Sequence, residues 1–235
     1  VVKTIYSLSC SRENIPRLAS DGVIALMEMV WQQEYKRPPD LAQYIFAILY
    51  NLTTCYEAQG TLVSHGIVYL IMDMWEEARK DETMTQLIAK AIVHLCCGNI
   101  NTSRAVAEGA PTILTYIVDN QRIIKDGRQG FSYDMAYRVS AAMRNILCIP
   151  NNHMQMVQQG CIRALESIAA QSEKGKNAND PVTPHTQANC LAAFKSMTYN
   201  SEVRDALTSS GAIDVIVQEL LQEDTAITYP LLVQV

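Results

Sequence analysis

The stretch that decides the fold is Asp40–Gly66, which reads DLAQYIFAILYNLTTCYEAQGTLVSHG. Its first half is a long segment with apolar residues at helical spacing, and it ends in Asn51-Leu52-Thr53. A polar break and a shorter apolar segment then lead to Gly66, where glycine suits the backbone of a sharp turn. The pattern predicts a long helix, a corner, a short helix and a second corner.

The same sequence pattern recurs along the chain, which indicates internal repeats. Glycines that follow a short apolar segment lie 44, 43, 51 and 51 residues apart, at Gly22, Gly66, Gly109, Gly160 and Gly211. Fifteen residues before each glycine stands a small or polar residue that an apolar residue follows, namely Ser7, Asn51, His94, Asn145 and Ser196. Apolar residues also recur at fixed distances after each glycine. This agreement predicts a structural repeat.

Each repeat is expected to contain a short first helix, a second helix directly after the glycine, and a long third helix. Asparagines at the start of three first helices (Asn14, Asn101 and Asn152) predict side-chain caps. Trp31 and Trp75 occupy the same position in their repeats, nine residues after the glycine, which predicts packing between repeats. The four third helices are expected over Asp40–Cys55, about Thr83–Cys97, about Ser132–Ile149 and about Thr183–Tyr199.

Two insertions account for the two longer spacings. Asn120–Tyr133 and Gln171–His185 both carry glycine, lysine and polar residues between the expected second and third helices. Their composition predicts solvated loops. Each insertion is either a contact loop or additional loop length without a role of its own.

The bulk composition excludes several classes of protein. Of the 235 residues 49% are hydrophobic and 18% are charged, and no run approaches the roughly 20 apolar residues of a membrane span. The net charge of −5 and the lack of a basic stripe argue against nucleic acid as a partner. Seven cysteines without a disulfide spacing predict a reducing compartment, hence a cytoplasmic location. Both ends are interpreted as cuts through a longer array.

No catalytic, metal or cofactor site is expected. Cys10, Cys55, Cys97 and Cys148 fall near the ends of third helices, where buried small side chains are the simplest interpretation. His94 and Cys97 supply at most two ligands on one helix face, whereas zinc requires four, or three and water. No third group orients them as a nucleophile and base. We therefore expect a protein that is not an enzyme.

These motifs resemble the armadillo repeat family, in which Asn-Leu, a short helix and Gly-Ala-Ile recur. The resemblance rests on Asn51-Leu52, Asn145-Ile146, Gly109-Ala110-Pro111 and Gly211-Ala212-Ile213. It implies a single all-α domain, a right-handed α-solenoid of about five three-helix repeats. The implied boundaries are about 1–10 for a partial third helix, then 11–55, 56–98, 99–149, 150–200 and a partial repeat over 201–235.

The resemblance also implies a concave groove lined by the third helices. In nuclear-import receptors and β-catenin the asparagines of the Asn-Leu column bond the backbone of an extended peptide. One turn earlier, import receptors place tryptophans, whereas this sequence has Lys3, Ala47, Lys90, Ala141 and Ala192. Tyr44 and Tyr137 lie two turns before Asn51 and Asn145, so they belong either to the groove or to the core. The positions of this sequence that the resemblance assigns to the groove are Tyr44, Ala47, Asn51, Lys90, His94, Tyr137, Ala141, Asn145, Ala192 and Ser196.

The expected function is that of a non-enzymatic scaffold that binds another protein in this groove. Small and largely neutral side chains there suit a closely packed helix or strand. The first alternative is a structural component of a large cytoskeletal or axonemal (ciliary) assembly. The second is a nuclear-import receptor, which the missing tryptophans and the charge of Lys90 disfavour, because Lys90 would repel a basic signal.

Overall fold

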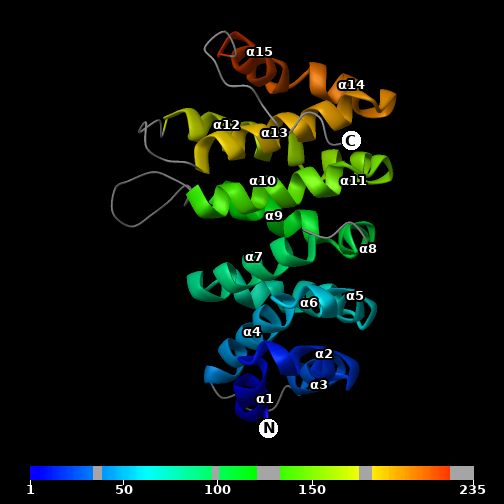
Figure 1. Cartoon of the computed structure of the whole chain (residues 1–235), viewed down its shortest axis with the longest axis vertical. Coiled ribbons are helices and arrows are strands. Elements are labelled where there is room, and N and C mark those ends of the chain that lie inside the picture. The colour runs from blue at the N-terminus through cyan, green and yellow to red at the C-terminus, as the bar shows by residue number, and fades with distance from the viewer. Residues whose placement is uncertain (34–38, 97–100, 121–132, 175–181, 223–235) are drawn as a thin grey trace.

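The computed structural model describes residues 1–33, 39–96, 101–120, 133–174 and 182–222. Within these ranges every regular element is helical, which confirms the all-α prediction (Figure 1). Short helices precede the glycines: α2 (Ile15–Ser20), α5 (Tyr56–Ser64), α8 (Thr102–Ala107), α11 (His153–Gln158) and α14 (Ser201–Thr208). The 3-10 turns η1 (Arg12–Asn14) and η2 (Pro150–Asn152) lead into α2 and α11.

Each second helix starts at the residue that directly follows its glycine, as the repeat predicts. These helices are α3 (Val23–Gln32), α6 (Ile67–Ala78), α9 (Ala110–Asn120), α12 (Cys161–Lys174) and α15 (Ala212–Gln222). Helices that match the expected third helices are α1 (Val2–Ser9), α4 (Pro39–Thr53), α7 (Glu82–Cys96), α10 (Tyr133–Leu147) and α13 (Val182–Thr198). The boundaries of the last four lie within two residues of the sequence-based ones. The long apolar segments therefore fixed the type and place of these helices.

The helices stack in chain order along the long axis of the molecule (Figure 1). In particular α1, α4, α7, α10 and α13 pack each against the next. We call these five helices the third-helix layer. Side chains up to 49 residues apart in the sequence meet at its seams.

Glycine corners separate the short helices from the second helices. Gly22, Gly66, Gly109 and Gly160 have φ between 81° and 105°, a region that side chains with a Cβ atom disfavour. At Gly109 a Cβ atom would also come within 2.9 Å of Met72 Cε. Gly211 lies at the matching corner between α14 and α15 with a φ outside this region.

The asparagine caps predicted for the first helices are wrong. Asn14, Asn101 and Asn152 accept no capping hydrogen bond from the helices that follow them. Instead, Asn14 Nδ2 donates to the Leu8 carbonyl at 3.1 Å, and Asn152 Nδ2 donates to the Ile146 carbonyl at 3.0 Å. The last carbonyls of a helix lack intrahelical partners. These two amides therefore tie the start of a first helix to the end of the preceding third helix.

The predicted core column is confirmed where the structure describes it. Trp31 and Trp75 are buried, as are Val118 and Ala169 at the matching positions. The side chain of Leu220, the fifth member, lies outside the described residues. Trp75 meets Tyr116 edge-on across α6 and α9, with ring centroids 5.0 Å apart.

The two predicted loops are shorter than expected. Asn120 and Tyr133 belong to α9 and α10, and residues 121–132 lie outside the described part of the chain. In the second insertion, α12 continues to Lys174 and α13 already begins at Val182. The loop assignment is therefore wrong at the ends of both insertions, where the residues belong to the flanking helices. Gln, Glu and Lys favour helices, and a proline is tolerated in a first helical turn, as at Pro184.

Candidate functional site

The predicted groove residues all lie in the third-helix layer, on α4, α7, α10 and α13. Each of the ten is half-buried or exposed, and none belongs to the core. Tyr44 and Tyr137, which the sequence left between groove and core, both keep surface exposure, with 40% of Tyr137 exposed. Asn51, His94 and Ser196 make hydrogen bonds at the seams, that is, at the interfaces between successive helices of the layer.

At the seam between α1 and α4, the amide of Asn51 is engaged inside the protein. Its Nδ2 donates to Ser9 Oγ at 3.1 Å and to Cys10 Sγ at 3.7 Å. Two turns earlier, Tyr44 meets the ring of Tyr6 edge-on at 5.4 Å, and Lys3 Nζ lies 5.3 Å from the centre of the Tyr44 ring. Asn51 therefore holds two helices together, and its predicted bond to a ligand stays a prediction.

His94 occupies the seam between α4 and α7. Its ring stacks on Tyr50 with centroids 5.6 Å apart, and its Nδ1 lies 3.2 Å from Thr53 Oγ1. The Thr53 hydroxyl donates to the Tyr50 carbonyl at 2.7 Å, so its oxygen accepts from Nδ1. This network assigns the proton of the neutral imidazole to Nδ1.

The surroundings of His94 favour its neutral form. Burial lowers the pKa of His94, and the charges of Arg138 on α10 and Lys90 on α7 lower it further. Each of these effects disfavours the charged imidazolium. His94 is therefore a neutral side chain at physiological pH.

The seam between α10 and α13 is built around Arg144. Its Nη1 donates to Asn189 Oδ1 at 2.8 Å, and its Nε and Nη2 donate to Asn145 Oδ1 at 3.3 and 3.0 Å. Asn189 Nδ2 donates in turn to Ser140 Oγ at 3.2 Å. Both acceptors of Arg144 are amide oxygens, which fix the guanidinium without neutralising its charge.

Two further contacts place predicted groove residues at this seam. Ser196 Oγ donates to the Leu147 carbonyl at 2.5 Å, and so caps the end of α10 from α13. Tyr137 meets His185 edge-on with ring centroids 6.4 Å apart. Sequence reasoning missed Asn189, His185 and Tyr50 because their partners lie on other repeats.

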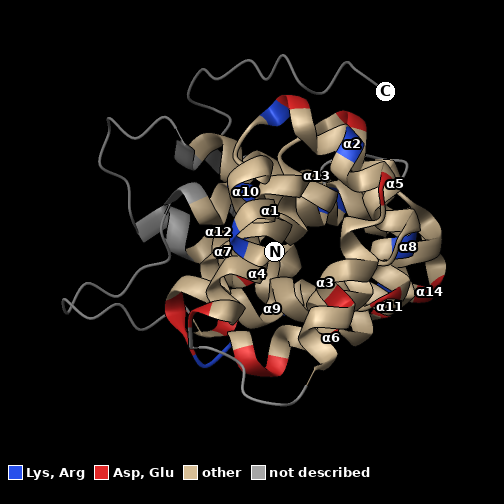
Figure 2. Cartoon of the chain, turned by 90° about the horizontal axis from the view of Figure 1, so that it is seen from below, with Lys and Arg blue, Asp and Glu red and all other residues tan. Residues whose placement is uncertain are grey.

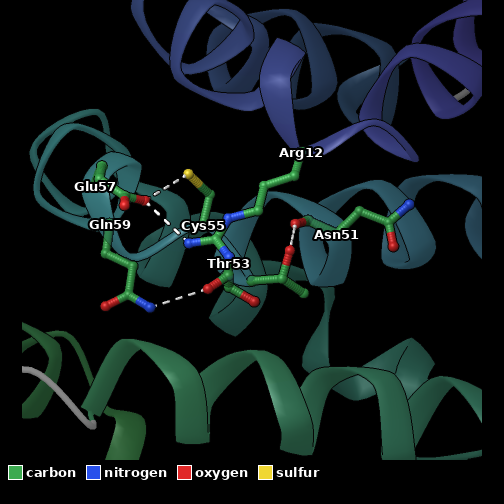
Figure 3. A network of polar contacts seen from close by, with 7 residues as sticks. Arg12, Asn51, Thr53, Cys55, Glu57 and Gln59 are labelled. Atoms are coloured by element: carbon green, nitrogen blue, oxygen red, sulfur yellow. Dashed lines mark hydrogen bonds and ion pairs between the residues drawn. The ribbon is translucent and has the colours of Figure 1, made fainter.

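A polar network closes the corner between α4 and α5 (Figure 3). Cys55 Sγ donates to Glu57 Oε2 at 3.2 Å, and Arg12 Nη2 reaches the same oxygen at 3.4 Å. Hydrogen bonds from its own backbone, from Cys55 and from Arg12 lower the pKa of Glu57. Gln59 Nε2 donates to the Thr53 carbonyl at 3.0 Å. Because only 2% of Cys55 is exposed, the network links the two segments and offers no accessible thiol.

The cysteine prediction holds only in part. Cys55 is buried, but Cys10 and Cys148 are exposed, because they follow the last turn of α1 and α10 instead of facing the core. Cys97 lies outside the described residues. No group of three or more metal-binding side chains gathers in the described ranges.

One open depression of about 550 Å³ lies where η2 and α11 meet the corner between α13 and α14. Exposed Tyr199 and Met154 contribute to its walls. The buried ring of His153 also lines it, with Nε2 at 2.6 Å from the Leu147 carbonyl. Glu202 is the one carboxylate among its lining residues.

The environment of His94 predicts a pH dependence of stability. Its pKa is lower in the folded protein than the ordinary value of about 6.5, so the unfolded chain binds its proton first. The stability contribution of the neutral ring is complete above about pH 6.5 and is lost as the pH falls through the folded pKa. We expect the melting temperature of the wild type to fall more between about pH 7.5 and pH 5 than that of His94→Gln, measured by circular dichroism. Equal falls would contradict this assignment.

Comparison with known proteins adds a likeness of fold. No protein-family model matches the sequence, and no curated protein matches it either. The crystal structure of an engineered protein, a structural genomics target, is similar, with a TM-score of 0.59 and 14% sequence identity. The match covers 91% of this chain and 83% of the engineered one. At this identity the likeness concerns the fold alone.

No helix in the described ranges has both the length and the apolar character needed to cross a membrane.

Proposed function

We propose that this chain is a right-handed armadillo-type solenoid of about five repeats that acts as a non-enzymatic scaffold. It binds another protein along the third-helix layer, and a cytoplasmic location is part of the proposal. Three repeated features support the solenoid: the short helix, the glycine corner with positive φ, and the third helix that packs on its predecessor. A regular stack of this kind presents an extended surface to partners.

The observation that carries the proposed function is the presence of alanine at three of the five matching positions along the layer, the other two being Lys3 and Lys90. Ala47, Ala141 and Ala192 occupy the same place in their repeats and are half-buried or exposed. A partner backbone can approach closely where side chains are this small. Polar groups lie one turn further along each helix, where Asn51 and Asn145 keep partial exposure. Main-chain groups of an extended segment pair with such amides.

Enlarging two of these alanines tests the proposal. We expect the double variant Ala141→Gln and Ala192→Gln to recover its partner proteins from source cells at least about tenfold less than the wild type, because the added atoms clash with a docked segment. Glutamine is a good helix former, so the fold is expected to persist. The measurement is quantitative mass spectrometry of co-purified proteins, with circular dichroism melting curves alongside.

The matched control carries the same change on other helices. Ala107→Gln and Ala170→Gln alter exposed positions on α8 and α12. This control is expected to keep the partners that the wild type recovers. If the variant of the layer keeps them too, the third-helix layer is not the binding surface.

A further inference from the structure

The depression beside α11 and α14 lies apart from the groove residues of the third-helix layer. The two helices pack against each other, and none of the ten groove residues lines the depression. Its volume of about 550 Å³ falls within the range of pockets that bind ligands. The side chains around it therefore decide whether it forms a second binding site, and for which chemistry.

Two large side chains of the depression are exposed. Tyr199 is 76% exposed, more than any other tyrosine whose side chain the structure describes, and Met154 is 37% exposed. The face of an exposed aromatic ring carries a partial negative charge that attracts cations. Methionine adds a flexible and polarisable apolar contact beside the ring. Together the two side chains suit a ligand group that is flat or apolar and positively charged.

The charge of the depression is negative. Glu202 is exposed and forms no ion pair within the described ranges, and no lysine or arginine stands among the lining residues, all of which the structure describes. Figure 2 shows acidic ribbon beside the label α14, the helix that carries Glu202. Arg204 of the same helix lies two residues further along, and positions two apart do not share a helix face. The carboxylate is therefore available to a cation.

His153 adds an unpaired acceptor among the lining residues. Only 1% of it is exposed, and its Nε2 donates to the Leu147 carbonyl at 2.6 Å. Because a carbonyl only accepts, Nε2 carries the proton of the neutral ring and Nδ1 carries a lone pair. This Nδ1 is buried and has no hydrogen-bond partner among the described residues. A buried lone pair without a donor favours positive charge nearby over negative charge.

An anion finds little to bind in the same place. At the start of α14, Asn200 Oδ1 already accepts from the backbone N–H of Glu202 at 3.0 Å. The Glu202 carboxylate supplies the negative charge that a helix start favours. Pro150 has no backbone N–H to offer. An exposed ring, a carboxylate and an unpaired acceptor thus define a site for a cation.

From this arrangement we infer that the depression binds an arginine side chain of a partner protein, with the guanidinium between the Tyr199 ring and the Glu202 carboxylate. A guanidinium is planar, stacks on aromatic faces and pairs with a carboxylate through two N–H groups, whereas an ammonium does neither as well. The site goes beyond the proposed function, because it does not involve the small residues of the third-helix layer.

The test is a titration of the full chain with the blocked peptide acetyl-Gly-Arg-Gly-amide, followed by NMR of isotope-labelled methionine methyl groups. Met154 lines the depression, so its methyl signal reports on the site directly, and Met154→Leu assigns that signal. We expect a saturable shift of the Met154 signal. The signals of Met74 and Met143, which are fully buried in the core, are expected to stay in place.

Variants of two lining residues test the assigned contacts. Glu202→Gln and Tyr199→Ala are each expected to weaken binding at least about fivefold, because one removes the charge partner and the other the ring. Tyr199→Phe keeps the ring and is expected to stay within about twofold of the wild type. His153 is left unchanged because its Nε2 bonds the last turn of α10.

Glu82→Gln provides the matched control for net charge. Glu82 is exposed and lies in the first turn of α7, as Glu202 lies in the first turn of α14. This control is expected to stay within about twofold of the wild type, since screening by salt weakens distant charges. Unchanged melting curves are expected for all these variants, because the altered side chains are exposed. Equal losses for Glu82→Gln and Glu202→Gln would overturn the inference.

Three further ligands test the chemical class. The same peptide with citrulline, which resembles arginine but has no charge, is expected to bind at least about tenfold more weakly. The lysine peptide is expected to bind at least about threefold more weakly, and free arginine no more tightly than the blocked peptide. No saturable shift with the arginine peptide, or equal binding of the citrulline or lysine peptide, would overturn the inference. Tighter binding of free arginine would replace the protein partner by a small molecule and overturn it too.

The outcome is separable from that of the proposed function. Ala141→Gln/Ala192→Gln alters the third-helix layer and is expected to leave the Met154 titration unchanged. If the arginine peptide fails to bind while this variant loses its cellular partners, only the site at the depression is wrong. If the peptide binds as expected while the variant keeps its partners, the depression stands as a binding site without the groove.

Discussion

Trp75→Ala is expected to lower the free energy of unfolding by about 3–5 kcal/mol, the range observed for buried tryptophans. Only 5% of Trp75 is exposed, and its ring meets Tyr116 edge-on at 5.0 Å. The substitution removes apolar contact between α6 and α9 and leaves a cavity in which neighbouring side chains lose their packing partners. The measurement is a urea titration followed by circular dichroism.

Tyr69 provides the control on the same helix. It is 62% exposed, so Tyr69→Ala is expected to change the free energy of unfolding by less than about 0.5 kcal/mol. Both substitutions replace an aromatic residue of α6 by alanine, so helix propensity affects them similarly. Similar losses for the two variants would show that Trp75 does not join the neighbouring helices energetically.

The second large effect is expected at Asn189, whose side chain is 4% exposed. Asn189→Leu removes the acceptor of Arg144 Nη1 and the donor to Ser140 Oγ, although it nearly keeps the volume. Hydrogen bonds to charged groups contribute about 1.5–3 kcal/mol, so we expect a destabilisation of about 2–3 kcal/mol. Thermal and urea unfolding measure it.

A double-mutant cycle attributes this loss to the Arg144 contact. Arg144→Met removes the charge, so Asn189→Leu in that background is expected to cost clearly less than in the wild type. Asn189→Asp keeps an acceptor opposite the guanidinium and is expected to keep most of the stability. Strict additivity of the two substitutions would contradict a direct energetic link across the seam between α10 and α13.

The sequence alone predicted much of the fold. The run before Asn51 gave α4 to within two residues, because apolar residues at helical spacing form a helix wherever they pack. Gly22, Gly66, Gly109 and Gly160 marked corners with positive φ, which few other residues adopt. The Trp31 and Trp75 column predicted burial correctly, since both faces of such a stack contact neighbouring helices.

The ten predicted groove residues lie on the helices that the sequence assigned to them, but their contacts were not predicted. All ten groove residues lie on the third-helix layer, because the repeat fixes which helix carries them. Their partners could not be predicted: Asn51 bonds Ser9, which lies 42 residues away, and Arg144 bonds Asn189, 45 residues away. The expected caps at Asn14 and Asn152 failed for the same reason, since a carbonyl of another helix was the better partner.

By itself the sequence determined an all-helical chain with repeated corners, because periodicity and glycine conformation are local properties of the backbone. Only the tertiary structure decided which polar groups meet across the seams. Those outcomes depend on distances between residues that are more than 40 positions apart, as with Thr53 and His94. Such distances are set by the packing of one helix on the next, and no local pattern encodes them.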